Sequence, residues 1–184
     1  MITKIRGSHW THDLSGSWTV LARGGDSADI VPNVDSDAGG RAADQAVGAP
    51  QVRRFSSGTT WEPVVGYSRA VAAGDFVFVS GCTSVAGAQF VHPGDAYAQT
   101  RQAIGNAADG LTGLGASLAD VVQTRMYVTD ISRWQEYGRA HGDVFGAIRP
   151  AATMIEVAAL IEPEMLIEVE VVAYKPGIGR KGDR

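Results

Sequence analysis

Cysteine is almost absent from this sequence, because Cys82 is the single cysteine among 184 residues. One cysteine cannot form a disulfide within the chain, and it cannot supply a cluster of thiolates for a metal ion. The four histidines show no metal-ligand spacing except a weak pair, His9 and His12, in a segment that does not have the pattern of a folded domain. The residues therefore predict no metal site.

Long apolar runs and an excess of basic residues are also missing. No run approaches the roughly 20 apolar residues that cross a bilayer, and the N-terminus lacks the charged-then-apolar pattern of a signal peptide. Lys and Arg number 16 against 20 Asp and Glu, so the net charge is −4, the wrong sign for neutralising phosphates. We expect a cytoplasmic protein without a membrane partner, and the charge disfavours nucleic acid as a partner.

Hydrophobic periodicity is missing from the first part of the chain. Gly and Asp recur there between isolated apolar residues, a texture typical of disorder. We expect residues 1–51 to be a disordered or vector-derived extension and residues 177–184 to be a flexible tail. One domain is then predicted over residues 52–176, within the usual size of a single domain.

The domain begins with two predicted strands. Val65, Tyr67, Arg69 and Val71 alternate with smaller residues, which predicts a strand from Val64. A turn at residues 73–75 follows, and residues 76–80 are apolar on both faces of a strand, as a central strand covered on both sides requires. Together they predict a hairpin with a central strand.

Two helices and three further strands follow. Asp95 is predicted to cap a helix that ends at Gly115, and the spacing of Ser132 and Gln135 predicts a capping box for a second helix, which Pro150 ends. Strands are predicted over residues 121–129, 152–159 and 166–173. The order ββαβαββ predicts an α+β layer in which both helices cover one face of the sheet. Tyr127, Met154 and Leu166 give the other face apolar character, which favours contact with another subunit.

Paired carboxylates are the first candidate for chemistry. Strand periodicity places Glu168 and Glu170 on one side of the sheet, where mutual repulsion and burial would raise one pKa toward neutrality. Such a group could perform acid–base catalysis. The alternative is a solvated strand face.

Tyr67, Ser80 and Gly81 form a second candidate cluster. A glycine beside a hydroxyl lets a ligand approach the main chain closely, although many ordinary strands also contain Ser-Gly. Cys82 is predicted to pack in the core. His141 is predicted to be a hydrogen-bonded core or interface residue rather than a catalytic one.

Arg125 lies on a predicted strand among apolar neighbours. A guanidinium seldom enters a sheet face without an anionic partner. That partner is either Glu168 or Glu170, in an ion pair, or the carboxylate of a ligand.

The ordered set of motifs resembles the Rid family (YjgF, reactive intermediate deaminase) over residues 52–176. This resemblance implies a chorismate-mutase-like α+β fold, a mixed sheet with two helices on one face, and a homotrimer with a central barrel. It also implies small-molecule clefts between subunits, in which active members hydrolyse imines and enamines to keto acids and ammonia without metal or cofactor. The motifs that carry it are Val65-Gly66-Tyr67, Phe78-Val79-Ser80-Gly81, Asp95, Gln99-Thr100-Arg101, Asp120-Val121-Val122, Val128-Thr129-Asp130, Arg149-Pro150-Ala151 and Ile167-Glu168-Val169-Glu170.

The resemblance also assigns roles to residues. Glu168 would position the attacking water, and Tyr67, Ser80 and Gly81 would contact the substrate. The family's carboxylate-binding arginine is absent, because Ala152 occupies its place and Met154 stands where a cysteine is common. Either another arginine binds the carboxylate, with Arg125 as first candidate and Arg69 or Arg101 behind it, or the pocket takes ligands that lack this carboxylate.

Three functions remain open at this point. The first is hydrolysis of imines or enamines with Glu168 as base, and the loss of the arginine predicts weak or absent activity on 2-imino acids. The second is a non-catalytic trimeric module that binds a metabolite. The third is RNA cleavage, reported for some members of the family, which the acidic balance disfavours.

Overall fold

The computed structural model describes residues 9–12, 18–21 and 52–179, which belong to two separate units. In the first unit, β1 (His9–His12) and β2 (Trp18–Leu21) form an antiparallel pair. The rest of the predicted extension, 1–51, and the end of the predicted tail, 180–184, lie outside the described residues. Gly177 to Gly179 are described, and the backbone N–H of Gly177 donates to Asp75 Oδ1 at 2.9 Å.

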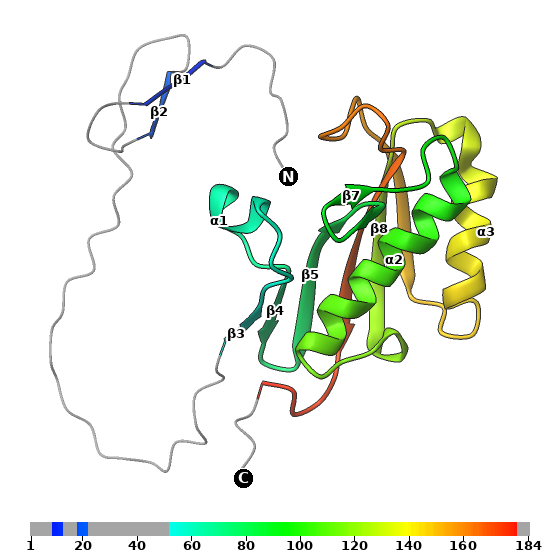
Figure 1. The fold of residues 1–184 in the computed structure, drawn as a ribbon. Coiled ribbons are helices and arrows are strands. Elements are labelled where there is room, and N and C mark those ends of the chain that lie inside the picture. The colour runs from blue at the N-terminus through cyan, green and yellow to red at the C-terminus, as the bar shows by residue number, and fades with distance from the viewer. Residues whose placement is uncertain (1–8, 13–17, 22–51, 180–184) are drawn as a thin grey trace, which may run out of the picture. The chain divides into compact units, whose positions relative to one another are not determined.

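A mixed sheet of six strands is the centre of the second unit (Figure 1). All neighbouring strands are antiparallel except β8 and β9, which are parallel. This arrangement confirms the predicted mixed sheet. It also contains one strand that the sequence pattern does not predict, β3, which lies at the edge of the sheet beside β4. In spatial order the strands are β3 (Arg53–Phe55), β4 (Ala70–Ala73), β5 (Phe76–Cys82), β10 (Ile167–Tyr174), β8 (Val121–Val128) and β9 (Ala151–Glu156).

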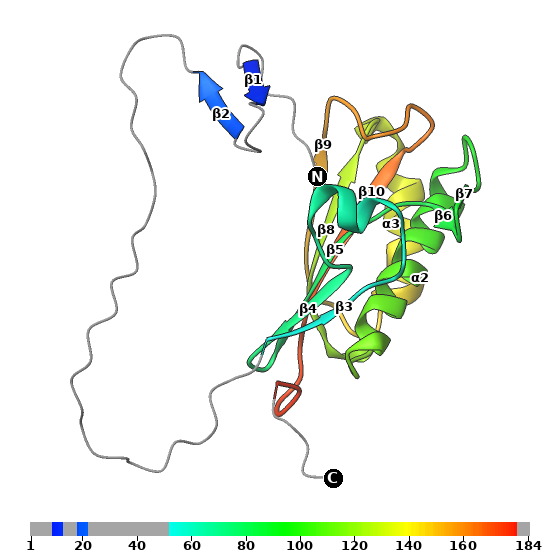
Figure 2. The same ribbon diagram turned by 60° about the vertical axis from the view of Figure 1, so that its left-hand side comes forward.

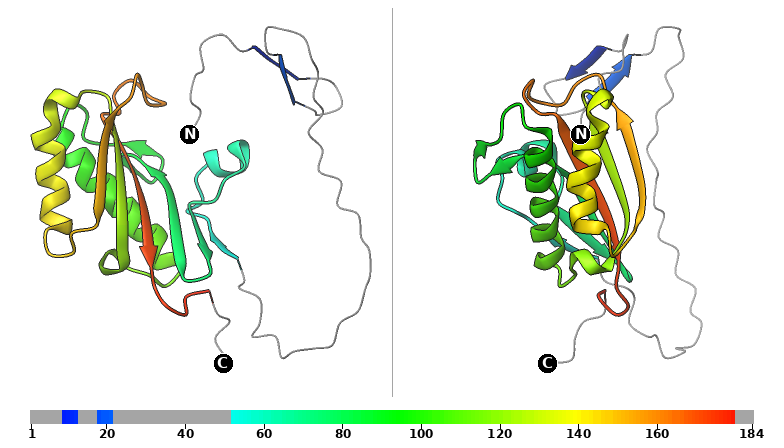
Figure 3. Two further views of the ribbon diagram at one scale, coloured as in Figure 1. Left: turned by 180° about the vertical axis from the view of Figure 1, so that it is seen from behind. Right: turned by 90° about the vertical axis from the view of Figure 1, so that its right-hand side faces the viewer.

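Two long helices cover one face of this sheet, as predicted. Figures 2 and 3 show α2 (Ala96–Gly113) and α3 (Trp134–Phe145) on the same side of the strands. The core lies between these layers because every second residue of the central strands is apolar and buried. Representative buried side chains are Val77, Val79, Ile104, Leu111, Met126, Val128, Tyr137, Phe145, Ile167, Val169 and Val171.

The first long helix begins and ends where the sequence predicts. The Asp95 carboxylate accepts a hydrogen bond from the backbone N–H of Ala98 at 2.9 Å, which satisfies a donor in the first turn. Gly115 follows the helix with φ +89°, a left-handed conformation that glycine adopts without strain.

The start of the domain differs from the prediction of a strand from Val64. Trp61–Val65 instead form a short helix, α1, which Gly66 ends in the left-handed conformation with φ +80°. Tyr67 and Arg69 therefore lie in the connection to β4 rather than inside a strand. The alternating pattern was misleading because the buried residue of α1 is a charged one, Glu62, which strand periodicity does not register.

The predicted capping box at Ser132 and Gln135 is also wrong. Asp130 accepts from the backbone N–H of Ser132 at 3.0 Å, so the chain first forms a 3-10 turn, Ile131–Arg133. The α-helix begins only at Trp134, a residue that is 55% exposed.

The remaining described elements are short. β6 (Val85–Ala86) and β7 (Gln89–Phe90) form a small antiparallel pair before α2, and the 3-10 turn Leu118–Asp120 precedes β8. None of the helices in the described ranges is both long enough and apolar enough to cross a bilayer.

Candidate functional site on the open face of the sheet

Glu168 and Glu170 lie together on the sheet face that no helix of the described residues covers. Their neighbours Ile167, Val169 and Val171 are buried toward the helices, so strand alternation turns both carboxylates the other way. This confirms the predicted common side. Both glutamates are half-buried.

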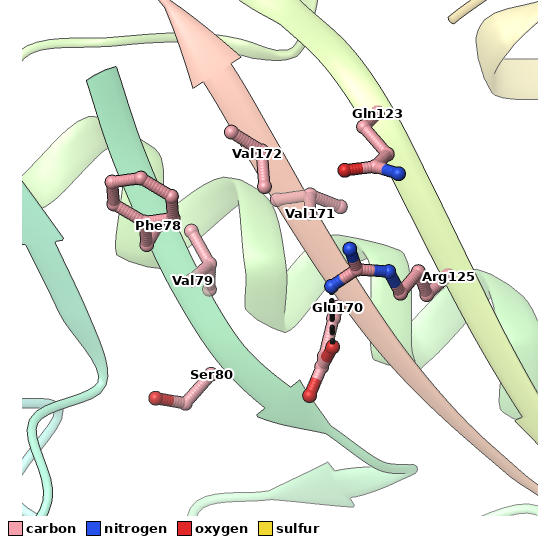
Figure 4. A pocket seen from close by; sticks show the side chains of 8 residues that line it. All are labelled: Phe78, Val79, Ser80, Gln123, Arg125, Glu170, Val171 and Val172. Atoms are coloured by element: carbon pink, nitrogen blue, oxygen red, sulfur yellow. Dashed lines mark ion pairs between the residues drawn. The ribbon is translucent and has the colours of Figure 1, made fainter. Parts of the chain in front are cut away.

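Glu170 is held by two residues of the neighbouring strand β8. The Tyr127 hydroxyl donates to Glu170 Oε2 at 3.0 Å, and Arg125 Nη1 lies 3.7 Å from the same oxygen. Figure 4 shows Arg125 and Glu170 reaching toward each other from adjacent strands. Glu170 is thus an anionic partner of Arg125 within the chain, one of the two ion-pair partners that the sequence predicts.

A shallow cavity of about 230 Å³ surrounds this ion pair. It contains the predicted site residues Ser80 and Arg125, and Phe78 and Val172 supply apolar walls (Figure 4). The cavity opens on the uncovered face, so a small polar molecule could reach the Arg125 guanidinium there.

Ser80 and Gly81 form a β-bulge in β5. Val79 pairs with Val171 of β10 and Cys82 pairs with Val169, so two residues of β5 stand opposite the single residue Glu170. The sequence predicts Ser80 and Gly81 at the end of a strand, whereas β5 continues to Cys82. A bulge interrupts the ladder and re-aims the groups beside it.

Gly81 lies directly against the Glu168 carboxylate. A Cβ atom at position 81 would overlap Glu168 Oε1, so a residue larger than glycine would displace the carboxylate. The structure therefore brings Gly81 and Glu168 together.

Arg69 connects the remaining members of the site. Its Nη1 donates to the Gly81 carbonyl at 2.6 Å, and its Nη2 donates to the Tyr67 hydroxyl at 3.1 Å. Ser80 joins the same network, because its backbone N–H donates to the Arg69 carbonyl at 3.0 Å. From the sequence, Arg69 ranks only behind Arg125, as a possible partner of a substrate carboxylate, and this connecting role is not predicted. The one sequence signal for it is the position of Arg69 just before a buried strand.

The environment of Glu168 favours its protonated form. Burial raises the pKa of Glu168, and the nearby Glu170 carboxylate raises it further, whereas the Arg69 guanidinium lowers it. The net direction is upward, toward the range in which a carboxyl group both accepts and donates protons near neutral pH.

Cys82 and His141 have the structural roles that the sequence predicts. Burial raises the pKa of the Cys82 thiol to about 11 despite the nearby Arg69 guanidinium, so the group remains a thiol. His141 Nε2 lies 2.9 Å from the Thr124 hydroxyl, and burial lowers the pKa of its imidazole.

Ala152 and Met154 are not brought to Glu168 within one chain. In β9 they pair with Thr124 and Met126, whose side chains face the helices. They therefore share the face opposite to Glu168, and Met154 packs partly against the core. Arg101 lies on α2, also on the helix side of the sheet.

Within the part of the chain that the structure describes, no group of three or more His, Cys, Asp or Glu side chains is placed to hold a metal ion.

The fold and the site together define a class: a mixed sheet with two helices on one face and a glutamate beside a Ser-Gly bulge on the other. The chain belongs to the family described as Endoribonuclease L-PSP, the YjgF/Rid family, whose model matches residues 58–175. This confirms the family that the sequence motifs resemble.

Similar proteins agree with this assignment. A crystal structure of a Mycobacterium tuberculosis member of the YjgF/YER057c/UK114 family is 48% identical, covers 67% of this chain and 99% of its own, and has a TM-score of 0.62. An uncharacterized Streptomyces coelicolor protein is 38% identical over 69% of this chain and 95% of its own. The 3-aminoacrylate deaminase RutC of Acinetobacter baylyi is 32% identical over 61% of this chain and 89% of its own.

Proposed function

We propose that this protein hydrolyses small imines or enamines to a carbonyl compound and ammonia, with Glu168 as the acid–base group. The observation that carries the proposal is the Glu168 carboxyl group, which lies against Gly81 and has a raised pKa on an open sheet face. The name of the relative RutC adds support, because 3-aminoacrylate is a small enamine.

The reaction needs only proton transfers at one carboxylate. Glu168 accepts a proton from water as the water oxygen bonds to the imine carbon, and the C=N electron pair moves to nitrogen. Nitrogen takes up that proton from Glu168, which gives an amino alcohol. The carboxylate then carries a second proton from the new hydroxyl group to nitrogen, the C–N bond breaks, and the C–O bond becomes a carbonyl as ammonia leaves. An enamine first gains a proton at carbon and loses one from nitrogen, which converts it to the imine. No electron is gained or lost overall, and one carboxyl group can serve each transfer in turn.

Arg125 is the proposed partner for a substrate carboxylate. Its side chain is 46% exposed, it borders the cavity beside Ser80, and its contact with Glu170 is long at 3.7 Å. Arg69 is not suited to this role, because the Gly81 carbonyl and the Tyr67 hydroxyl already occupy its Nη atoms.

We further propose that the working form is a homotrimer with small-molecule clefts between subunits. The open face of the sheet carries exposed apolar side chains that water does not favour, including Phe76, Phe78, Val122 and Tyr174. In such an assembly, Ala152 and Met154 of β9, which lie away from Glu168 of their own chain, could border the cleft of a neighbour.

Ammonia release tests the proposed activity. Freshly generated 2-iminopropanoate and 2-iminobutanoate are supplied to wild type, Glu168→Gln and Arg125→Ala, with the exposed Glu164→Gln as a charge-matched control. We expect turnover in wild type and Glu164→Gln, almost none in Glu168→Gln, and a large rise in KM in Arg125→Ala. Unchanged turnover in Glu168→Gln would refute the proposed role of this carboxylate.

A second candidate function is a non-catalytic module that binds a metabolite. Alanine at position 152 favours it, because a methyl group cannot form the charge-assisted contacts of a guanidinium with a substrate carboxylate. A screen of imines and enamines distinguishes the two functions, since turnover that depends on Glu168 excludes the binding module.

A further inference from the structure

Glu62 is a buried carboxylate that the proposed chemistry leaves unused. Only 4% of this residue is exposed, although glutamate is seldom so deeply buried unless it has partners. Its partners are the Ser56 hydroxyl, the backbone N–H of Ser57 at 3.0 Å and the Ser57 hydroxyl at 2.6 Å. Burial raises the pKa of Glu62, but the hydrogen bonds from Ser56 and Ser57 outweigh that effect and keep it below its ordinary value.

This carboxylate stands at the border of the candidate site. A groove of about 470 Å³ is lined by residues on both sides of α1, and it contains both Glu62 and the site residue Tyr67. The segment that Glu62 holds is therefore next to the phenol that Arg69 contacts.

Ser57 links Glu62 to Arg69. Its hydroxyl donates to Glu62 Oε1 and accepts from Arg69 Nε, a longer contact of 3.4 Å. A serine hydroxyl can donate once and accept as well, so the two bonds are compatible. The link continues through the guanidinium to the Gly81 carbonyl and the Tyr67 hydroxyl.

We propose that Glu62 is a positioning residue, which acts through the Ser57 hydroxyl on Arg69 and thereby fixes the Gly81 carbonyl and the Tyr67 phenol. Each of the three guanidinium nitrogens of Arg69 bonds to a group of its own chain. Arg69 thus holds the bulge next to Glu168 instead of binding substrate. Its planar group suits the task, because one rigid fork reaches three acceptors at once.

The catalytic consequence of this network rests on the proposed function, but its geometry can be tested without any substrate. Because Cys82 is the single cysteine, protein labelled with ¹³C at glycine carbonyls and ¹⁵N at cysteine has only one glycine–cysteine peptide, Gly81–Cys82. One carbonyl-to-amide NMR correlation therefore reports the Gly81 carbonyl, the acceptor of the Arg69 bond.

Ser57→Ala and Ser56→Ala are the decisive pair of variants. Both remove a hydroxyl that donates to Glu62, but only the Ser57 hydroxyl touches Arg69. We expect Ser57→Ala to move the Gly81 carbonyl resonance upfield, in the direction of a weaker hydrogen bond, and Ser56→Ala to leave it in place. With an imine substrate, Ser57→Ala should lower kcat about tenfold with KM unchanged, because the lost hydroxyl bonds to two charged groups, the Glu62 carboxylate and the Arg69 guanidinium.

Each outcome separates the network from the reaction. A carbonyl resonance that stays in place in Ser57→Ala, or that moves equally in Ser56→Ala, overturns the positioning role of Glu62. The expected shift in a protein whose wild type releases no ammonia supports the network and refutes the proposed function instead. Glu62→Gln gives a second readout, since an amide keeps one acceptor for the Ser57 hydroxyl and should move the resonance less than Glu62→Ala.

Discussion

Glu168 is a residue whose ionised form makes the folded protein less stable. Burial and the Glu170 carboxylate raise its pKa above the value of an unfolded chain. A carboxyl group with a raised folded pKa contributes stability below its unfolded pKa and loses that contribution as pH rises through the folded pKa. Glu168 therefore does not add to the stability of the fold at pH values where its carboxyl group is ionised.

Glu168→Gln should therefore be more stable than wild type at mildly alkaline pH. The amide has no charge to desolvate, so the two proteins should have similar melting temperatures in acid and diverge as pH rises. Thermal unfolding across this range, followed by circular dichroism, measures the difference. A variant that melts at or below the wild-type temperature throughout would show that the Glu168 carboxylate is well accommodated.

Gly81→Ala should destabilise the protein by less than the about 1–3 kcal/mol of overpacking a core, because the atoms in the way are the flexible end of a half-buried side chain. The new Cβ would overlap the Glu168 carboxylate. Adding Glu168→Ala should recover most of the loss, because the obstructing atoms are then gone. Urea unfolding of the two single variants and the double variant measures this coupling.

Gly105→Ala is the matched control for that experiment. A Cβ at Gly105 meets no atom within 4 Å in the middle of α2, so alanine there should stabilise by about 1 kcal/mol. Additive effects of Gly81→Ala and Glu168→Ala would contradict the close approach.

The residues of the site could be predicted only in part. Strand periodicity was enough to place Glu168 and Glu170 on one face, because alternation is a local property of the chain. The role of Arg69 depends on contacts with Ser57 and Gly81, at sequence distances of 12 residues each. The mistaken prediction of a strand from Val64 also hid the role of Arg69, because Arg69 lies in the connection between α1 and β4 that begins at Gly66.

At the level of elements, the N-terminus of α2 depends on a single side chain. Asp95 accepts from the Ala98 N–H, one of the donors that the helix itself cannot satisfy. Asp95→Ala should lower the free energy of unfolding by about 1 kcal/mol, measured by urea unfolding. Asp109→Ala, an exposed position within the same helix, should have a much smaller effect. Equal losses in the two variants would mean that general charge effects, rather than the cap, determine the result.

The two helices show why one cap was predicted correctly and the other was not. Asp95 directly precedes the first apolar position of α2, so the nearest capping side chain is also the correct one. Before α3 two side chains compete as caps. In the predicted capping box the Gln135 side chain would accept from the backbone N–H of Ser132, but the Asp130 carboxylate accepts from it instead. A capping pattern identifies possible partners, and the geometry of the preceding turn selects among them.

At the level of the whole molecule, α2 and α3 cover one face of the sheet, and no helix within residues 52–179 covers the other. The family fold could be predicted because its motifs occur in order along one chain. The assembly depends on surfaces of several chains, and the sequence pattern indicates only that the open face is apolar. Phe76 is central to that face, because its ring lies 6.3 Å from Phe78 and 5.2 Å from Tyr174, measured between ring centroids.

The proposed trimer predicts that one charge on this face separates the subunits. Phe76 is 43% exposed, so burying the rest of it between subunits contributes less than half of the about 1.5–3 kcal/mol that full burial of an exposed side chain gives, for each copy. Phe76→Lys replaces that gain with an ammonium group that must leave water. Light scattering coupled to size-exclusion chromatography should give the mass of three chains for wild type and a lower mass for the variant. The variant should also lose ammonia release if the clefts lie between subunits.

Trp134→Lys, on the helix side and 55% exposed, is the matched control and should keep both the mass and the activity. A wild type that elutes as one chain, or a Phe76→Lys protein that keeps the mass of three, would mean that the aromatic face serves another contact.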